Sequence, residues 1–212
     1  MPVKVHSLVV GAIQTNCHIV YDGESPEVMI VDPGGDADVI AVKAKSLSLD
    51  PKWIVLTHCH GDHIAGLGEV KRRFPDAKIA AHEADAPALT DANLNLSGML
   101  GTPFTAPPAD RVLNENDEIQ VGALSFRVIH TPGHTPGGIC LYAEGDPPVL
   151  LAGDTLFAGS VGRSDFPGGS HEQLIDSIKT KLLVLPDETR VYTGHGPVTT
   201  IGEEKDSNPF LR

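Results

Sequence analysis

Residues 57–63 read Thr-His-Cys-His-Gly-Asp-His, and this stretch constrains the 212-residue chain more than any other. The apolar run from Trp53 to Leu56 precedes it and predicts a buried strand. His58, His60 and Asp62 alternate, so they project to one side of an extended segment, whereas on a helix positions two apart diverge. The glycine allows a sharp turn, and a helix can begin near the last histidine. The stretch therefore predicts a metal site on a loop between a strand and a helix.

The bulk composition indicates a soluble, acidic, globular chain. The length of 212 residues predicts one domain, residues 1–212, with at most a small appendage, and the 41% of hydrophobic residues suffice for its packed core. The formal charge of −12 argues against a nucleic-acid surface, which requires a basic face. No stretch reads as a membrane span or a signal peptide. The three scattered cysteines suit a reducing compartment, so a cytoplasmic location is expected, while the oligomeric state is left open.

Hydrophobic periodicity and turn residues divide the chain into strands and helices. Helices are predicted from Asp36 to about residue 47, from Ile64 to Phe74, and after a capping box of Ser170 and Gln173. Two β-rich halves, each closing with a helix and a strand, indicate two sheets covered by helices on both outer faces. Strands are predicted at residues 3–10, 17–21, 27–31, 53–56, 78–81, 123–129, 138–143, 149–152 and 190–193.

One long segment shows little periodicity. Residues 93–110 are rich in proline, glycine and threonine. They are expected to form either a long surface loop or a flap over the site.

Three further segments end a predicted strand with a side chain that can bind metal. His134 lies in a turn shaped by glycine and proline at residues 130–137, Asp154 follows an apolar strand, and His195 follows the last strand. Strand ends of this kind gather ligands at one edge of a sheet. Imidazole and carboxylate ligands without thiolate favour zinc, iron or manganese.

The set Thr-His-x-His-x-Asp-His, followed by His134, Asp154 and His195 in that order, resembles the metallo-β-lactamase superfamily over nearly the whole chain. The resemblance implies an α/β fold, the four-layer αβ/βα sandwich. It also implies two divalent metal ions about 3.5–4 Å apart, with zinc expected and iron or manganese as alternatives. Carried over position by position, the first ion would be bound by His58, His60 and His134, the second by Asp62, His63 and His195, and Asp154 would bridge them.

Within the superfamily, Asp154 and two further segments resemble the small, single-domain bacterial glyoxalase-II-like hydrolases. These segments are residues 162–169, Gly-Arg-Ser-Asp-Phe-Pro-Gly-Gly, and the stretch from Gly194 to Phe210. The implied reaction is hydrolysis of a hydroxyacyl thioester of the S-lactoylglutathione type by a metal-activated hydroxide. Asp62 and Asp154 would take part in catalysis as metal ligands. The sequence has no counterpart of the C-terminal helical domain with which full-length glyoxalase II grips glutathione, so the carrier thiol is left open.

Residues outside the ligand set allow simpler readings as well. Asp32 either orients a ligand histidine or is an ordinary turn residue. Arg163 either meets an acidic substrate or pairs with Asp165 to hold its own loop, and the ion pair is favoured for Asp165. The remaining candidates are given structural roles: Cys17, Cys59 and Cys140 in packing, His130 at a strand end, and Glu203 and Glu204 on a solvated surface.

Other activities are compatible with the same residues. A persulfide dioxygenase of this superfamily would use one iron bound by His58, His134 and Asp154, and it has a similar Gly-Arg-x-Asp-Phe segment. The activated hydroxide could also open a lactone or another ester. A metal-binding scaffold without catalysis would be expected to lack ligands, and every expected ligand is present here. In each catalytic case the partner is a small molecule.

Overall fold

Two six-stranded sheets dominate the structure, a computed structural model that describes residues 2–212. The first sheet contains, in spatial order, β1 (Lys4–Val10), β2 (Thr15–Tyr21), β3 (Glu27–Val31), β4 (Asp50–Val55), β5 (Lys78–His82) and β6 (Arg111–Leu113). The second contains β14 (Thr199–Thr200), β13 (Arg190–Thr193), β10 (Val149–Gly153), β9 (Ile139–Ala143), β8 (Leu124–His130) and β7 (Glu118–Val121). A short hairpin joins β11 (Leu156–Phe157) to β12 (Ser160–Val161).

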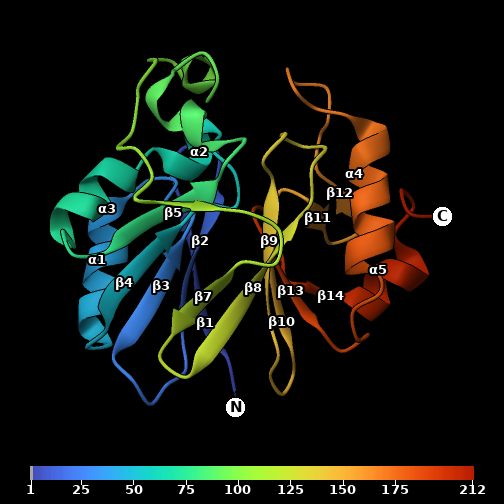
Figure 1. The fold of residues 1–212 in the computed structure, drawn as a ribbon, viewed down its shortest axis with the longest axis horizontal. Helices are drawn as coiled ribbons and strands as arrows, with labels where there is room; N and C mark the ends of the chain where they lie inside the picture. The colour runs from blue at the N-terminus through green and yellow to red at the C-terminus, as the bar shows by residue number, and fades with distance from the viewer. Residues whose placement is uncertain (1) are drawn as a thin grey trace.

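Helices cover the outer face of each sheet, as Figure 1 shows. On the side of the first sheet lie α1 (Ala37–Ser46) and α3 (Leu67–Arg73), and on the side of the second lie α4 (His171–Ser177) and α5 (Ile201–Ser207). The shorter helical segments are α2 (Gly61–Ile64), η1 (Ala86–Thr90), η2 (Ser97–Leu100) and η3 (Ile178–Leu182). The predicted four-layer αβ/βα sandwich is confirmed. Among the helices of residues 2–212, none has the length and hydrophobicity needed to cross a membrane.

Neighbouring residues of the central strands belong to different layers of the core. Ile30 of β3 packs in the layer beneath α1 and α3, whereas Met29 lies in the layer between the two sheets. Leu151 of β10 shares that middle layer, while Leu150 packs beneath α4. Successive strand side chains point to opposite faces, so a strand buried on both faces reads as a continuous apolar run. The apolar run before Thr57 is such a strand.

Every predicted strand has a counterpart, but the shortest elements were missed. The strands β6, β7, β11, β12 and β14 have two to four residues each, which is too few for an alternating pattern to stand out. The single helix predicted from Ile64 to Phe74 is wrong. Gly66 separates α2 from α3, and its N–H donates to the Pro33 carbonyl at 2.8 Å instead of continuing one helix.

The helix ends correct two further expectations. Asp36 precedes α1, but it lies in the left-handed region (φ 44°) and its carboxylate accepts a hydrogen bond from the Gly11 N–H rather than capping the helix. At α5, Thr200 and Glu203 form a complete capping box that was not predicted. Glu204 is only 2% exposed, so its assignment to a solvated surface is wrong.

Candidate metal centre

The stretch at residues 57–63 changes conformation halfway along its length. His58 and His60 lie on the loop that follows β4, and His60 is still extended (φ −68°, ψ 151°). Asp62 and His63 instead belong to α2, so the expectation that Asp62 continues one extended alternation is wrong. Because of this helical turn, Asp62 and His63 lie beside His195, whereas the two histidines of the extended part, His58 and His60, lie beside His134. One short segment thus supplies two clusters.

Gly61 is required for space rather than for a sharp turn. A Cβ added to it would lie 2.9 Å from the Ser97 Cα. The segment of residues 93–110 therefore packs directly on the turn that bears the histidines, which places this segment beside the site as a flap would lie.

The first cluster consists of three buried imidazoles from both halves of the chain. The Nδ1 of His60 lies 3.0 Å from the Nε2 of His134, and that atom lies 3.2 Å from the Nε2 of His58. Two nitrogens bound tetrahedrally to one zinc at about 2.0–2.1 Å would lie about 3.3 Å apart. The separations in this cluster are close to that value.

The second cluster combines a carboxylate with two imidazoles. The Oδ2 of Asp62 lies 3.3 Å from the Nε2 of His63 and 3.2 Å from the Nε2 of His195. The three ligand atoms offered by these residues all lie within 4.8 Å of one another.

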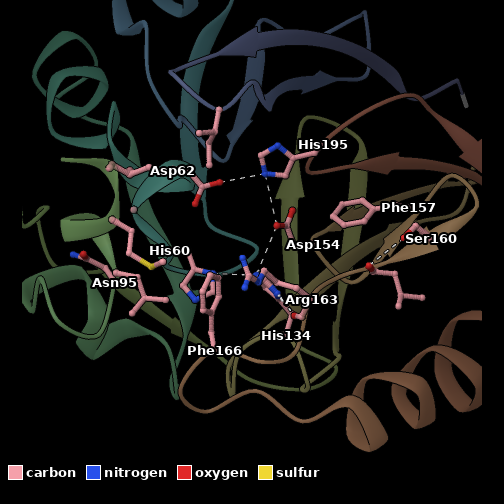
Figure 2. Close-up of a pocket in the computed structure, with 16 residues that line it drawn as sticks. His60, Asp62, Asn95, His134, Asp154, Phe157, Ser160, Arg163, Phe166 and His195 are labelled. Atoms are coloured by element: carbon pink, nitrogen blue, oxygen red, sulfur yellow. Dashed lines mark hydrogen bonds and ion pairs between the residues drawn. The ribbon is translucent and has the colours of Figure 1, made fainter. Parts of the chain in front are cut away.

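Asp154 lies between the two clusters, as Figure 2 shows. Its Oδ1 is 3.4 Å from the Nε2 of His63, while its Oδ2 is 3.7 Å from the Nε2 atoms of both His134 and His195. A Cβ on Gly194 would lie 2.1 Å from the Asp154 Oδ1, so the residue before His195 must be glycine for this carboxylate to fit. Asp154 thus occupies the position that a residue shared by two ions would need.

Hydrogen bonds to the far side of each ring fix how three of the histidines present their nitrogens. The Nδ1–H of His134 donates to the Arg163 carbonyl at 2.7 Å, and that of His195 donates to the Gln14 carbonyl at 3.2 Å. The Nδ1–H of His63 donates to Asp32 at 3.0 Å. In each neutral ring the Nε2 lone pair then faces the cluster, which is the arrangement found for histidines that bind metals.

Two buried atoms at the centre have no hydrogen-bond partner among residues 2–212, the Nε2 of His63 and the Oδ1 of Asp154. They face each other at 3.4 Å, and in the neutral ring a lone pair would point at the carboxylate. Leaving such groups unpaired inside a protein is costly, and a cation between them removes the cost. The residues therefore fit two divalent cations, one in each cluster.

The pKa values follow the division into two clusters. Burial, with a contribution from His134, lowers the pKa of His60 to about 3, and burial together with His63 holds the pKa of His58 well below its usual value. Burial by itself would lower the pKa of His63. Asp154 and the other carboxylates around the ring have the larger, opposite effect, so the pKa of His63 lies well above the usual value. The first cluster thus offers neutral nitrogens, while the second concentrates negative charge.

Asp32 is placed by the structure against the second cluster. Besides its bond to His63, its Oδ1 accepts from the Thr57 N–H at 2.8 Å and its Oδ2 accepts from the Thr57 hydroxyl at 2.6 Å. The residue lies in the left-handed region (φ 51°) and is 1% exposed. It therefore fixes the start of the metal-binding stretch as well as the ring of His63.

A cavity opens above the clusters, and Arg163 is among the residues that line it, but its guanidinium is already engaged. Its Nε and Nη2 both donate to Asp165 at 2.8 Å, and the guanidinium carbon lies 3.7 Å from the centre of the Phe166 ring. This is the ion pair favoured for Asp165. The contact of Arg163 with the cluster is made by its backbone carbonyl, which orients His134.

Two residues that hold the site were missed, because their partners are mostly backbone groups distant in sequence. Asp85 is 5% exposed and accepts from the Gly137 N–H at 2.7 Å, the Thr135 hydroxyl at 2.8 Å and the Cys59 N–H at 3.2 Å. Asn16 donates through its side-chain amide to the carbonyls of Thr193 and Gly196 at 3.0 and 2.9 Å. Asp85 connects the two loops that carry the first cluster, and Asn16 holds the loop that carries His195.

The remaining candidates belong to neither cluster. Cys17, Cys59 and Cys140 are all buried and unpaired with one another. His130 stacks on the ring of His82 at 4.1 Å between centroids, and its Nε2 lies 2.9 Å from the Pro136 carbonyl, so it braces a strand end.

Known proteins similar to this chain belong to one superfamily, and they align over nearly its full length. Residues 10–195 match the family model described as the metallo-beta-lactamase superfamily. The chain is 41% identical to the probable metallo-hydrolase YqgX of Bacillus subtilis, an alignment that covers 98% of this chain and 97% of that protein. It is 39% identical to the hydroxyacylglutathione hydrolase GloC of Haemophilus influenzae, with 98% of both chains covered.

Solved structures are also similar to this chain over nearly its full length. The crystal structure of the BLEG-1 B3 metallo-beta-lactamase has a TM-score of 0.93 at 42% identity, with 98% of this chain and 99% of that chain covered. The crystal structure of TTHA1623 in a di-iron-bound form has a TM-score of 0.87 at 36% identity, with coverage of 98% and 100%.

Proposed function

The chain belongs to the metallo-beta-lactamase superfamily of metal-dependent hydrolases, and we propose that it hydrolyses a thioester of a small hydroxy acid at a dinuclear site. The single observation that carries the proposal is the position of Asp154 between two triads of ligands. Two ions that share such a carboxylate can flank one hydrolytic water. The 39% identity to a protein named hydroxyacylglutathione hydrolase supports a thioester as the bond that is cleaved.

Each ligand has a defined part in the proposed site. His58, His60 and His134 would bind the first ion, and Asp62, His63 and His195 the second. When bound there, the two ions would supply an activated water and polarise the carbonyl of the substrate. The protein's part is to hold these side chains in place, through hydrogen bonds such as those of Asp32 and of the Arg163 carbonyl. A thiolate is a good leaving group, so no protein acid needs to protonate it.

The metal content provides the first test. Protein produced with zinc, iron and manganese all available should contain two ions per chain and hydrolyse lactoyl thioesters without consuming oxygen. An Asp154→Asn variant should lose activity and about one ion, whereas Asp165→Asn, a change of the same chemistry in an exposed loop, should retain both ions. Lack of turnover of every thioester tested by the fully loaded protein would disprove the proposal.

Zinc is our first choice of metal, and iron is the main competitor. Histidine and carboxylate ligands suit both. The di-iron form of TTHA1623 supports iron as an occupant of a site of this kind. A lactone and a β-lactam belong in the assay panel, the latter because of the likeness to the BLEG-1 enzyme.

The persulfide dioxygenase remains the second candidate. It would need only His58, His134 and Asp154 around one iron. The closeness of His60 to His134, and the second cluster at Asp62, favour two ions instead. One iron per chain, together with oxygen uptake in the presence of a thiol persulfide, would establish the alternative.

A further inference from the structure

A cavity of about 550 Å³ opens directly above the candidate ligands. His60, Asp62, His134, Asp154 and His195 line its floor, and Figure 2 shows their side chains converging there. The volume falls within the range of small-molecule sites, about 300–1,000 Å³. The walls above this floor therefore select what can bind.

One wall of the cavity is an exposed apolar surface. We call the four residues that form it the apolar rim: Ile13, Leu96, Met99 and Leu100. Ile13 is 49%, Met99 68% and Leu100 37% exposed. Exposed apolar side chains gathered in one place, rather than scattered singly, mark a surface that binds something. Here they border the floor where the ligands converge.

The apolar surface continues past the rim. A second cavity of about 270 Å³ shares Ile13, Asp62 and Leu100 with the first. Its other walls include Ala12, Ala65 and Phe104. A chain-like group leaving the floor beside Asp62 would therefore remain in contact with apolar side chains as it extends.

The polar groups of the walls are already engaged within the protein. Among the residues that line the main cavity, Arg163 is the only arginine or lysine, and it is bound to Asp165 through two nitrogens. The Asn95 amide donates to the Phe104 carbonyl at 3.0 Å, and its oxygen accepts from the Ser97 N–H at 2.9 Å. A carrier with two carboxylates, such as glutathione, would find no free cation to pair with its charges.

From this distribution we propose that the substrate carries an uncharged, apolar arm that lies across the apolar rim. The inference rests on the proposed hydrolase and specifies its substrate class. An apolar arm would bury the rim on binding, whereas a charged peptide carrier would be desolvated against it without compensation. The rim selects the substrate, and the floor supplies the chemistry.

Two series of thioesters test the proposal on the metal-loaded protein. In one series the lactoyl group is kept and the thiol is a linear alkanethiol of increasing length or glutathione. In the other the thiol is kept and the acyl chain is lengthened. We expect kcat/KM to rise about two- to fourfold per methylene in one of the series, and the glutathione ester to be no better than the shortest alkyl ester. A preference for the glutathione ester, or no response to length in either series, would overturn the proposal.

A matched pair of variants assigns the effect to the rim. Met99→Gln replaces the most exposed rim residue with a polar side chain of similar length. Leu94→Gln makes a comparable change at a residue that is 56% exposed but does not line the cavity. We expect Met99→Gln to lower the ratio of kcat/KM for the long-chain substrate to kcat/KM for the short one about tenfold, with no effect from Leu94→Gln. A change of oligomeric state in Met99→Gln, with no change in chain-length preference, would mean that the rim contacts another copy of the chain.

A binding measurement separates this proposal from the proposed activity. The affinity of the metal-loaded protein for linear carboxylates of three to eight carbons can be measured by calorimetry without any turnover. Affinity that increases with length, in a protein that cleaves no thioester, would disprove the hydrolase but support the apolar arm. Hydrolysis of thioesters, with no dependence of affinity or rate on chain length, would support the hydrolase and disprove the apolar arm.

Discussion

At the scale of single residues, the candidate ligands and the residues that hold them differ in how visible they are in the sequence. A histidine or aspartate that ends an apolar strand can be recognised because its neighbours reveal the strand, and Asp154 and His195 were identified in this way. Asp85 and Asn16 bind backbone groups that become neighbours only in the folded chain. No local pattern marks such a residue, so only the structure reveals it.

Asp85 provides a prediction at this scale. In Asp85→Asn, one end of the side chain becomes a donor that faces the N–H of Gly137 or the donors of Thr135 and Cys59, so the two loops should separate slightly. We expect the affinity for metal at His58, His60 and His134 to fall about 10–100-fold, as for other residues that orient ligands. Competition with a coloured chelator, and the visible spectrum of the cobalt-substituted protein, would measure the loss.

Asp22 is a suitable control for this variant. Its buried carboxylate accepts hydrogen bonds from the N–H groups of Glu24, Ser25 and Ala123, away from the site. Asp22→Asn should therefore reduce the free energy of unfolding while leaving metal affinity unchanged. Equal affinity in Asp85→Asn and the wild type would contradict the assigned role.

At the scale of secondary-structure elements, α5 shows how an acidic pair can serve two purposes. Glu203 closes the capping box with Thr200, which stabilises the start of a helix only seven residues long. Glu204, on the buried side, accepts from the Gly159 N–H at 2.9 Å, the Thr199 hydroxyl at 2.6 Å and the Asn208 amide at 2.7 Å. It thereby ties α5 to the hairpin of β11 and β12, which carries Phe157 on the wall of the cavity.

The two glutamates should differ in their effects on stability. Replacing Glu203 by alanine removes half of a capping box and should cost about 1 kcal/mol in the free energy of unfolding. Glu204→Ala removes the acceptor of three donors, two of which belong to the buried residues Thr199 and Asn208, and should cost about 3 kcal/mol. Urea unfolding of the two variants would measure both values. Similar costs would show that Glu204 behaves as the surface residue that its sequence context suggested.

The sequence was informative about elements in proportion to their length. Strands of five or more residues, such as β3 and β10, show a buried run or an alternation and were predicted. The edge strands β6 and β7, with three and four residues, were not predicted, although the chain passes from the first sheet to the second between them. The break between α2 and α3 was missed as well, because the apolar spacing continues across Gly66 while the backbone does not.

At the scale of the whole molecule, the two sheets are joined near the site by a buried histidine. His18 of β2 donates through its Nε2–H to the Thr193 carbonyl of β13 at 3.2 Å, so its Nδ1 accepts from the Ser7 hydroxyl at 2.9 Å. The bond from the Ser7 hydroxyl needs the neutral ring, because a protonated Nδ1 cannot accept, whereas the Nε2–H can donate to the carbonyl in either state. Burial is the largest cause that lowers the pKa of His18 to about 4.

This histidine should make the fold sensitive to acid. Because its pKa is lower in the folded state, the unfolded chain binds a proton first, and the stability that depends on the neutral ring is lost as the pH falls from about 6.5 to about 4. The loss should reach about 3 kcal/mol. In His18→Gln that part of the pH dependence should disappear, while His171→Gln, at an exposed residue, should retain it. Unfolding of the metal-free proteins by urea at several pH values would reveal the difference, and parallel curves for wild type and His18→Gln would refute it.

The order of the strands also divides the chain into two consecutive pieces. The first sheet uses residues 4–113, the second uses residues 118–200, and an exposed turn joins them. His58, His60, Asp62 and His63 belong to the first piece, and His134, Asp154 and His195 belong to the second.

The protein could therefore be produced as two separate polypeptides, cut between Asn114 and Glu115, whose association would be promoted by metal. With free metal at 100 times the dissociation constant of a site, each ion bound between the fragments should tighten their association about a hundredfold relative to association in the presence of a chelator, and two ions about ten-thousandfold. In such a split form the binding of metal would reversibly control whether the two fragments associate. The fraction of associated fragments would then measure the metal concentration.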